Sequence, residues 1–385
     1  MARDCGPFTL RWLDAIDKID AQSWDALFPG DQPFLCHGFL AALEVSGCVG
    51  KSSGWKPLHL LIEKGERLVA ALPGYIKLHS FGEYVFDWSW ARAYEAHGLD
   101  YYPKWINAVP FTPVTGPRLG TADEVDQEWL LMTLSDSLKE QGQELGLSGM
   151  QWLFPPKGLS DKLERQGWRQ RKDIQFRWHN RGYESFTAFL AGLTARKRKS
   201  ILKERKGCSD MVIQRFEGGQ ITDDLWRQFL KCYQHTYAKR SGHFGYLNLA
   251  FFQELHKRLP DAAVLVMARE AEQSRWSAAA LYLKGKDALY GRYWGSLREH
   301  RGLHFELCYY QGIDYCIDHG LALFDAGAQG EHKLTRGFEP CWTYSNHLLY
   351  HPLFDQAVAD AVLQEQRQLE QLMKLYRSAL PYKAL

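Results

Sequence analysis

Charged side chains and glycines gather in residues 324–340, directly after an apolar run at 321–325. Gly327 and Gly330 allow the backbone to turn sharply or to approach a ligand closely. Four ionisable residues follow within six positions: Glu331, His332, Lys333 and Arg336. A lysine or arginine at such a place can neutralise a developing oxyanion or a phosphate. The segment therefore predicts a catalytic or substrate-binding loop, with Lys333 and Arg336 as the catalytic candidates. The alternative is a solvated loop with ordinary turn glycines.

A second candidate segment is the aromatic run at 287–295. Gly291 inside a strand pattern indicates a bulge or a close backbone approach. Arg292 stands among aromatic residues that include Tyr290 and Trp294. This arrangement suits a carboxylate or phosphate in an aromatic cleft, so we predict Arg292 as catalytic and the two aromatic residues as substrate-binding. The alternative is a structural ion pair between Arg292 and Asp287.

Residues 298–306 lie at the predicted start of a helix, where free backbone N–H groups suit an anion such as a pyrophosphate. His300, His304 and Glu306 are spaced in a way that superficially suggests a metal site. No second set of ligands accompanies them, so we predict no metal.

Seven of the eleven residues from 196 to 206 are basic. On a helix, four of them share one face through spacings of three and four residues: Arg196, Lys199, Lys203 and Lys206. Such a face can bind the phosphates of RNA or of a nucleotide-linked substrate. The alternative is an exposed, solvated helix face.

Two weaker candidates combine aromatic residues with ionisable ones. Glu83 and Asp87 lie in the aromatic segment 79–88, which predicts an acceptor pocket. His243 lies in the flexible aromatic loop 241–246, where it is a candidate for substrate binding or for general-base catalysis. A hydrogen-bonded structural role is the alternative for His243.

Composition limits the class of protein. The chain has 385 residues, a net charge of +2 and eight scattered cysteines without a C-x-x-C pair. These features predict two soluble domains in a reducing, cytoplasmic compartment, without a zinc ribbon. The N-terminal segment lacks the apolar core of a secretory signal, and no run approaches the 18 apolar residues of a membrane span. Walker, G-x-S-x-G and dinucleotide-binding motifs are absent from the sequence.

The order of expected elements repeats. A helix, a three-strand meander, a second helix and a closing strand are predicted at 38–46, 58–62, 68–76, 84–90, 124–145 and 150–154. The same order follows at 249–259, 262–269, 274–284, 287–294, 303–319 and 321–325. We therefore predict an α+β protein with domains at 1–170 and 171–385, joined near 155–175. A long helix at 354–380 is predicted to pack across a domain, with a dimer contact as the alternative.

Several of these segments resemble the bacterial FemAB-like family of the GNAT acyltransferase superfamily: 79–88, 101–104, 109–114, 242–246, 289–295, 303–306 and 327–333. The resemblance covers about residues 8–350. It implies two tandem GNAT-like domains, each a mixed and mainly antiparallel sheet flanked by helices. The basic segment 195–206 resembles the basic helix that Fem transferases carry at the start of their second domain.

The resemblance also implies a chemistry. Fem transferases move an amino acid from aminoacyl-tRNA to an amine of a peptidoglycan precursor, and a Phe-Lys pair after the last core strand supports the transferring carbonyl. His332 replaces the Phe here, so only the role of the lysine carries over, to Lys333. Acyl-CoA-dependent relatives carry a glycine-rich pyrophosphate loop, from which residues 298–303 depart because Arg301 stands in place of the first glycine.

The resulting hypothesis is an N-acyltransferase that uses aminoacyl-tRNA and an amine-bearing acceptor, a small molecule or a peptide. The co-substrate is aminoacyl-tRNA or acyl-CoA, and no permanently bound cofactor is expected. An acyl-CoA-dependent N-acetyltransferase is the first alternative. A non-catalytic module that binds a cell-wall precursor or RNA is the second.

Overall fold

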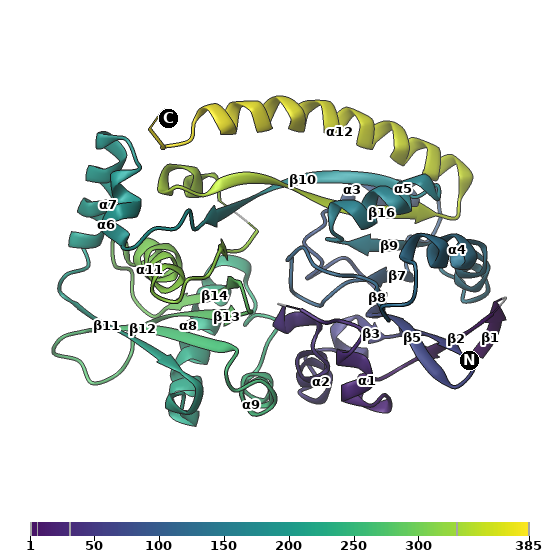
Figure 1. Ribbon diagram of the computed structural model, residues 1–385, viewed down its shortest axis with the longest axis horizontal. Helices are drawn as coiled ribbons and strands as arrows, with labels where there is room; N and C mark the ends of the chain where they lie inside the picture. The colour runs from purple at the N-terminus through teal and green to yellow at the C-terminus, as the bar shows by residue number, and fades with distance from the viewer. Residues whose placement is uncertain (1, 6, 31, 329, 384–385) are drawn as a thin grey trace. The chain divides into compact units, whose positions relative to one another are not determined.

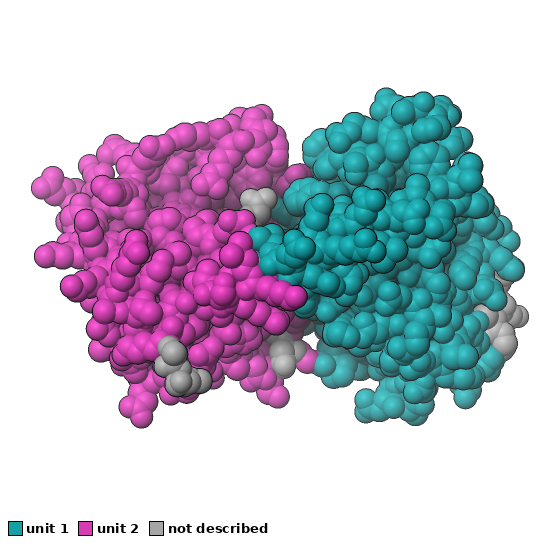
Figure 2. Space-filling view, turned by 90° about the horizontal axis from the view of Figure 1, so that it is seen from above, with its two compact units in different colours: residues 1–29, 34–174, 342–372 teal, residues 30–33, 175–341, 373–385 magenta. Residues whose placement is uncertain are grey.

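The computed structural model describes residues 2–5, 7–30, 32–328 and 330–383 (Figure 1). The chain forms two compact units (Figure 2). Unit 1 contains Met1–Pro29, Phe34–Ile174 and Trp342–Leu372, and unit 2 contains Gly30–Pro33, Gln175–Cys341 and Met373–Leu385. The first long crossing of the chain, after Ile174, lies close to the expected joint. Residues 342–372 return to unit 1, although the sequence analysis places them in the second domain.

Unit 1 contains two groups of strands. One has the order β1-β2-β4-β5-β8 and is antiparallel throughout. The other has the order β16-β9-β7-β6-β3. The strands are β1 (Ala2–Cys5), β2 (Phe8–Leu13), β3 (Trp55–Pro57), β4 (His59–Lys64), β5 (Arg67–Leu72), β6 (Gly74–Lys77), β7 (Lys104–Asn107), β8 (Gly120–Thr121), β9 (Gly149–Leu153) and β16 (Glu339–Leu349). The helices are α1 (Ala21–Asp25), α2 (His37–Val45), α3 (Trp88–Ala96), α4 (Gln127–Glu144) and α5 (Lys157–Arg165).

Unit 2 has a single run of strands in the order β11-β12-β13-β14-β15-β10. The strands are β10 (Arg169–His179), β11 (Met211–Glu217), β12 (Ala263–Glu270), β13 (Ala278–Lys284), β14 (Ala288–Ser296) and β15 (Leu323–Asp325). The first part of β10, up to Ile174, belongs to unit 1. The helices are α6 (Phe186–Ala191), α7 (Ala195–Lys206), α8 (Asp223–Ser241), α9 (Leu249–Arg258), α10 (Leu303–Phe305) and α11 (Gln311–Asp318). The long helix α12 (Pro352–Ser378) follows β16 (Figure 1).

The two units repeat one pattern of strand pairing. In unit 2, β13 and β14 are antiparallel, β14 and β15 are parallel, and β15 and β10 are antiparallel. In unit 1 the same three pairings link β6 with β7, β7 with β9, and β9 with β16. Each parallel pair is connected through a helical crossover, α10–α11 or α4, as parallel strands require. The predicted α+β fold with two tandem domains and a long C-terminal helix is confirmed.

Helix α4 illustrates how the sequence builds these layers. Its N-terminal end is capped by Asp126, whose carboxylate accepts a hydrogen bond from the backbone N–H of Trp129 at 2.7 Å. Leu130, Leu134 and Leu138 recur every four residues and are buried on one face. They pack in the same hydrophobic cluster as Trp105 of β7 and thus fix the helix against the parallel strands.

The expected strand at 84–90 is wrong. Residues 84–87 are irregular, and α3 begins at Trp88. Gly82 and Tyr84 both have positive φ values, of 79° and 61°, which an extended strand does not allow. The third strand of the meander is instead β7, at Lys104–Asn107. The expected run at 68–76 is also two strands, β5 and β6, which lie in different sheets on either side of Pro73.

The C-terminal end of strand β14 packs closely against helix α8 at Gly295. A Cβ atom on Gly295 would lie 2.1 Å from the backbone carbonyl carbon of Cys232. Gly295→Ala is therefore expected to destabilise the protein, near the upper end of the ~1–3 kcal/mol that overpacking costs, since backbone cannot rotate away as a side chain does. Thermal unfolding measures the loss. Gly219→Ala is the matched control, because nothing lies within 4 Å of a Cβ atom there; equal melting temperatures for the two variants would contradict this account.

Candidate functional site

The candidate site in unit 2 lies where β14 and β15 diverge. Their parallel pairing covers Ala288–Leu323, Leu289–Phe324 and Tyr290–Asp325. Gly291 still lies close to the departing chain, since a Cβ atom on it would be 3.2 Å from the Cα atom of Ala326. β14 continues to Ser296 against β13, while its pairing with β15 ends at Tyr290 and Asp325. The divergence leaves an edge of β14 beside a cavity.

The cavity has a volume of about 690 Å³. Its walls come from the C-terminal end of α8, the end of β14 and the loop that leads into α10. The lining residues are His235, Thr236, Lys239, Arg240, Trp294, Ser296, Leu297, Arg298, Glu299, His300, Arg301, Leu303 and His304. Lys239 forms an ion pair with Glu299, and Arg298 lies 3.4 Å from Glu270. Arg240 and Arg301 are exposed and make no ion pair with the described residues, so the cavity attracts anions.

Aromatic rings connect this cavity to the loop at 327–333. The ring of His304 lies 5.4 Å from that of Trp294 and 6.2 Å from that of His332, between centroids. The Tyr309 hydroxyl is 2.7 Å from Nε2 of His332. Burial, aided by nearby His332 and Arg240, lowers the pKa of His304 to about 3. His304 is therefore neutral at physiological pH and contributes an uncharged polar wall to a cationic cavity.

A π-helical turn places these rings. Residues Glu306–Tyr310 form this turn between α10 and α11, in the segment for which the sequence predicts one continuous helix. Such turns are frequent at functional sites because they shift the side chains that follow. The turn brings Tyr309 to His332 and buries Tyr310.

Lys333 lies in the 3₁₀ turn Glu331–Arg336 and is buried, with 1% of its surface exposed. Its ammonium donates a hydrogen bond to the carbonyl oxygen of Gly327. Gly327 has a φ of 87°, and its own N–H donates to Oδ1 of Asp325 at 3.1 Å. Burial lowers the pKa of Lys333 to about 8, against the opposing effect of Asp325. The structure thus joins two predicted site residues, Lys333 and Gly327, through one hydrogen bond.

Arg336 is held inside the protein. Its guanidinium forms a bidentate pair with Glu204 of α7, with Nη2 2.9 Å from Oε1, and lies 3.5 Å from the centroid of the Phe305 ring. These contacts fasten α7 to the turn that carries Lys333. They leave Arg336 as a residue that positions α7 and this turn, rather than one free to take a phosphate.

The other predicted residues of the loop and of β14 lie around this core. Tyr290 is buried, and Arg292 lies over the ring of Tyr293 at 5.4 Å. Glu331 accepts a hydrogen bond from the Tyr376 hydroxyl of α12. Gly330 has a φ of 114° and faces the ring of His332. Gln329 lies outside the described residues.

The predicted basic face is present on α7. All four of its members, Arg196, Lys199, Lys203 and Lys206, are exposed. The opposite side of the helix holds it in place, through buried Ile201 and through Arg205, which pairs with Glu306 at 3.1 Å. At its C-terminal end the helix contacts the cavity loop, since a Cβ atom on Gly302 would lie 3.4 Å from the carbonyl oxygen of Glu204. The helix that carries the exposed basic face therefore touches the loop that lines the cavity, at the C-terminal end of the helix.

Unit 1 contains a separate buried charge network. Nζ of Lys104 lies 2.8 Å from Oε2 of Glu83 and 2.5 Å from Oδ2 of Asp87, and all three groups are buried. Nζ of Lys77 lies 4.0 Å from Oε1 of Glu83. Burial raises the pKa of Glu83 to about 7, although Lys104 opposes the shift. Burial also disfavours ionisation of Asp87, but Lys104 outweighs it and the pKa of Asp87 is lowered. Both predicted carboxylates are thus engaged by lysines of the protein.

The comparisons with known proteins decide the family. The model of a family described as FemAB-like, peptidoglycan biosynthesis/recognition, matches residues 15–384. The chain belongs to the FemAB-like family. No curated protein matches the sequence.

Two solved structures share the fold of this FemAB-like chain. FemX is 11% identical over 91% of this chain and 100% of its own, with a TM-score of 0.55. A DUF2156 domain from Agrobacterium fabrum is 12% identical over 91% of this chain and 97% of its own, also with a TM-score of 0.55. The structural likeness supports the tandem fold that the strand pairings show.

Four lysines and arginines that the structure places at the unit 2 cavity or in the unit 1 network are not among the site residues predicted from the sequence. Lys239 and Arg240 at the cavity carry a detectable signal, because two basic residues before Ser241-Gly242 are typical of the end of a helix. Lys77 and Lys104 lie in short strands, and no pattern of charges in the sequence indicates which residues they pair with. Their pairing with Glu83 and Asp87 depends on the tertiary structure.

The remaining predictions concern His243 and metal. His243 lies after α8, where its Nδ1 accepts a hydrogen bond from the N–H of Gly245 at 3.0 Å, and it does not line the cavity. Within the described residues, no group of three or more His, Cys, Asp or Glu side chains is arranged to hold a metal ion. The described helices also include none with the length and apolar character needed to span a membrane.

Proposed function

We propose that this FemAB-like protein is an N-acyltransferase that takes an aminoacyl group from aminoacyl-tRNA and transfers it to an amine of a peptidoglycan precursor. The observation that supports the proposal is that α7, which carries the exposed basic face, touches the loop of the cationic cavity through its C-terminal end. A tRNA donor needs both a surface for its phosphates and a recess for its acylated end. The family description, peptidoglycan biosynthesis/recognition, supports the class of acceptor.

The reaction requires little covalent chemistry from the protein. The nitrogen of the acceptor amine attacks the ester carbonyl, and the C–N bond forms as the bond from the carbonyl carbon to the ribose oxygen breaks. The proton lost by the amine ends on that ribose oxygen. The carbonyl oxygen carries negative charge in between, and Lys333 stabilises it after exchanging its bond to Gly327 for one to the substrate. Holding an already activated ester beside the amine supplies much of the remaining acceleration.

An acyl-CoA donor is the second candidate function. Arg240 and Arg301, both exposed at the same cavity, offer charge for a pyrophosphate. Two reactions distinguish the two donors. Both contain the protein and a peptidoglycan precursor peptide with a free amine; one also contains bulk tRNA carrying labelled amino acids, and the other contains acetyl-CoA. Label passing from tRNA to the peptide, detected by mass, is the expected result. Acetylation alone would support the CoA donor. Binding of the precursor with no product from either donor would support a binding module.

The basic face provides a separate prediction. Changing Arg196, Lys199 and Lys203 together to glutamate is expected to weaken tRNA binding on the order of 30-fold at low salt, because phosphate contacts dominate such affinity. The slope of log Kd against log salt should fall in magnitude by at least ~2. The matched control reverses three exposed charges of unit 1, at Lys56, Lys64 and Arg92. Equal weakening by both triple variants would show an effect of net charge alone and would contradict a specific role of α7.

A further inference from the structure

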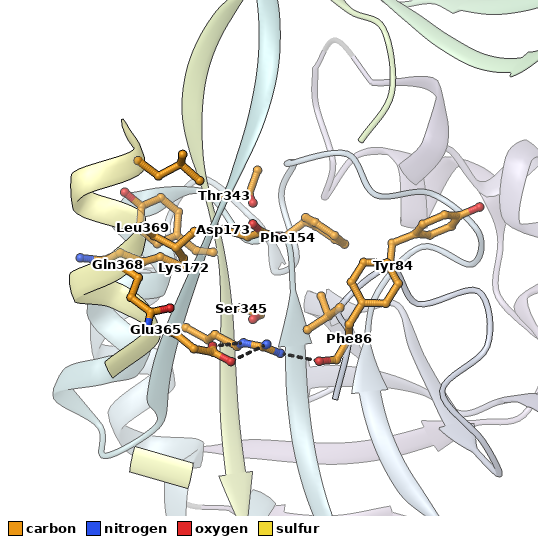
Figure 3. Close-up of a pocket in the computed structure, with 14 residues that line it drawn as sticks. Tyr84, Phe86, Phe154, Lys172, Asp173, Thr343, Ser345, Glu365, Gln368 and Leu369 are labelled. Carbon is orange, nitrogen blue, oxygen red and sulfur yellow. Dashed lines mark hydrogen bonds and ion pairs between the residues drawn. The ribbon is translucent and has the colours of Figure 1, made fainter. Parts of the chain in front are cut away.

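A second cavity lies entirely within unit 1 (Figure 3). Its volume is about 280 Å³, which suits a small ligand. Residues from five parts of the chain line it: the loop at 84–86, Phe154 after β9, residues 171–173 of β10, residues 343–345 of β16, and α12. No residue of this cavity takes part in the proposed transfer site.

Strained backbone shapes two of its walls. Tyr84 and Phe154 both line the cavity and have φ values of 61° and 58°, in the left-handed region that residues other than glycine rarely adopt. Such conformations persist only where the surrounding structure holds them, and they concentrate at functional sites. At Tyr84 the surrounding structure does so through Lys104, which binds Glu83 and Asp87 on either side of the segment 84–86. The buried network thus fixes an aromatic wall at the cavity.

Two charged side chains of this cavity, Lys172 and Asp173, form no ion pair with the described residues. Arg171 is satisfied, with its Nε 2.8 Å from Oε2 of Glu365 and its Nη1 3.0 Å from the carbonyl oxygen of Phe86 (Figure 3). The carboxylate of Asp173 is exposed and accepts one hydrogen bond, from the N–H of Ile174 at 2.7 Å. It forms no ion pair with the described residues. Figure 3 shows the ammonium of Lys172 at the far side of the cavity from Tyr84 and Phe86.

We infer that the unit 1 cavity binds a small organic cation. The ammonium group of this ligand pairs with Oδ2 of Asp173, since Oδ1 accepts the hydrogen bond from Ile174. Its apolar body lies against the aromatic wall of Tyr84, Phe86 and Phe154, whose ring faces also attract a cation. The inference concerns binding alone and does not rest on the transfer reaction of unit 2.

Titration calorimetry with three probes of similar shape tests this inference. Benzylammonium, benzyl alcohol and benzoate differ in charge but share the benzyl or phenyl body. We expect benzylammonium to bind at least tenfold more tightly than benzyl alcohol, and benzoate to bind least. Absence of binding by all three probes, or tighter binding of benzoate, would overturn the assignment.

Two variants locate the interaction. Asp173→Asn keeps the shape of an exposed side chain and is expected to remove the preference for benzylammonium, leaving the affinity for benzyl alcohol unchanged. Phe86→Ala, at another exposed position, should weaken both probes. Asp360→Asn is the matched control, since Asp360 is exposed on α12 and does not line the cavity. An unaltered preference in the Asp173 variant would refute the role of the cavity.

Discussion

Replacing Lys333 with methionine is expected to lower kcat for aminoacyl transfer by about 10²–10³-fold, the usual cost of removing one oxyanion donor. Methionine keeps the length and apolar stem of the side chain but has no ammonium, so the buried site stays filled. The rate is measured on the donor and acceptor that the product search identifies. Because the pKa of Lys333 is lowered to about 8, the ammonium is lost as pH rises through this value. Its contribution to the rate should therefore be present below pH 8 and disappear above it.

The control for this variant is Lys374→Met, at an exposed lysine of α12 in the same unit. It should leave both kcat and the melting temperature unchanged. A Lys333→Met protein that folds, binds tRNA and transfers at the rate of the unaltered protein would remove Lys333 from the mechanism. A fall in rate accompanied by equal loss of folded protein would assign Lys333 a structural role through its bond to Gly327.

Replacing Lys104 with methionine is expected to destabilise unit 1 by about 3–5 kcal/mol, because it leaves two buried carboxylates without their main partner. Lys77 cannot compensate, since its Nζ lies 4.0 Å from Glu83. Thermal unfolding followed by circular dichroism measures the change. Lys56→Met, at an exposed lysine of β3, is the control and should stay within ~0.5 kcal/mol of the unaltered protein.

A compensating variant separates charge from packing. Combining Lys104→Met with Glu83→Gln and Asp87→Asn removes the uncompensated charges, so it should recover most of the lost stability. A triple variant less stable than Lys104→Met alone would show that the network acts through shape and hydrogen bonds. In either case we expect the change to disturb the segment 84–86 more than any other part of the unit 1 cavity, because this segment is held between Glu83 and Asp87.

The fold could be predicted from the sequence because the order of its apolar runs repeats along the chain. The repeated order of apolar runs predicts a duplication, and the pairing of β13, β14 and β15 with its counterpart in unit 1 confirms it. The error at 84–90 came from aromatic residues that favour strands in general. The positive φ values of Tyr84 and of nearby Gly82, together with the buried Asp87, override that preference. The membership of residues 342–372 in unit 1 was also not visible, since it depends on pairing between β16 and β9, which are far apart in the sequence.

The candidate site was predictable where charge and glycine stand together in the sequence. The segment with Gly327 and Lys333 is such a case, and the structure links the two directly. The sequence does not distinguish a charged side chain that is exposed to solvent from one that forms an ion pair inside the protein. Arg336 and Lys203 look alike in the sequence, yet Glu204 holds the first and the second is exposed. The partner, rather than the residue type, decides which cation is available to a ligand.

The most direct test of the account is hydrogen–deuterium exchange of the protein with aminoacylated tRNA, with deacylated tRNA and with acetyl-CoA. We predict that aminoacylated tRNA protects two segments together, residues 195–206 and residues 297–304, because α7, which carries the basic face, touches the cavity loop. Deacylated tRNA should protect the first segment more than the second. Protection of 297–304 by acetyl-CoA, with no protection of 195–206 by either tRNA, would contradict the aminoacyl-tRNA donor.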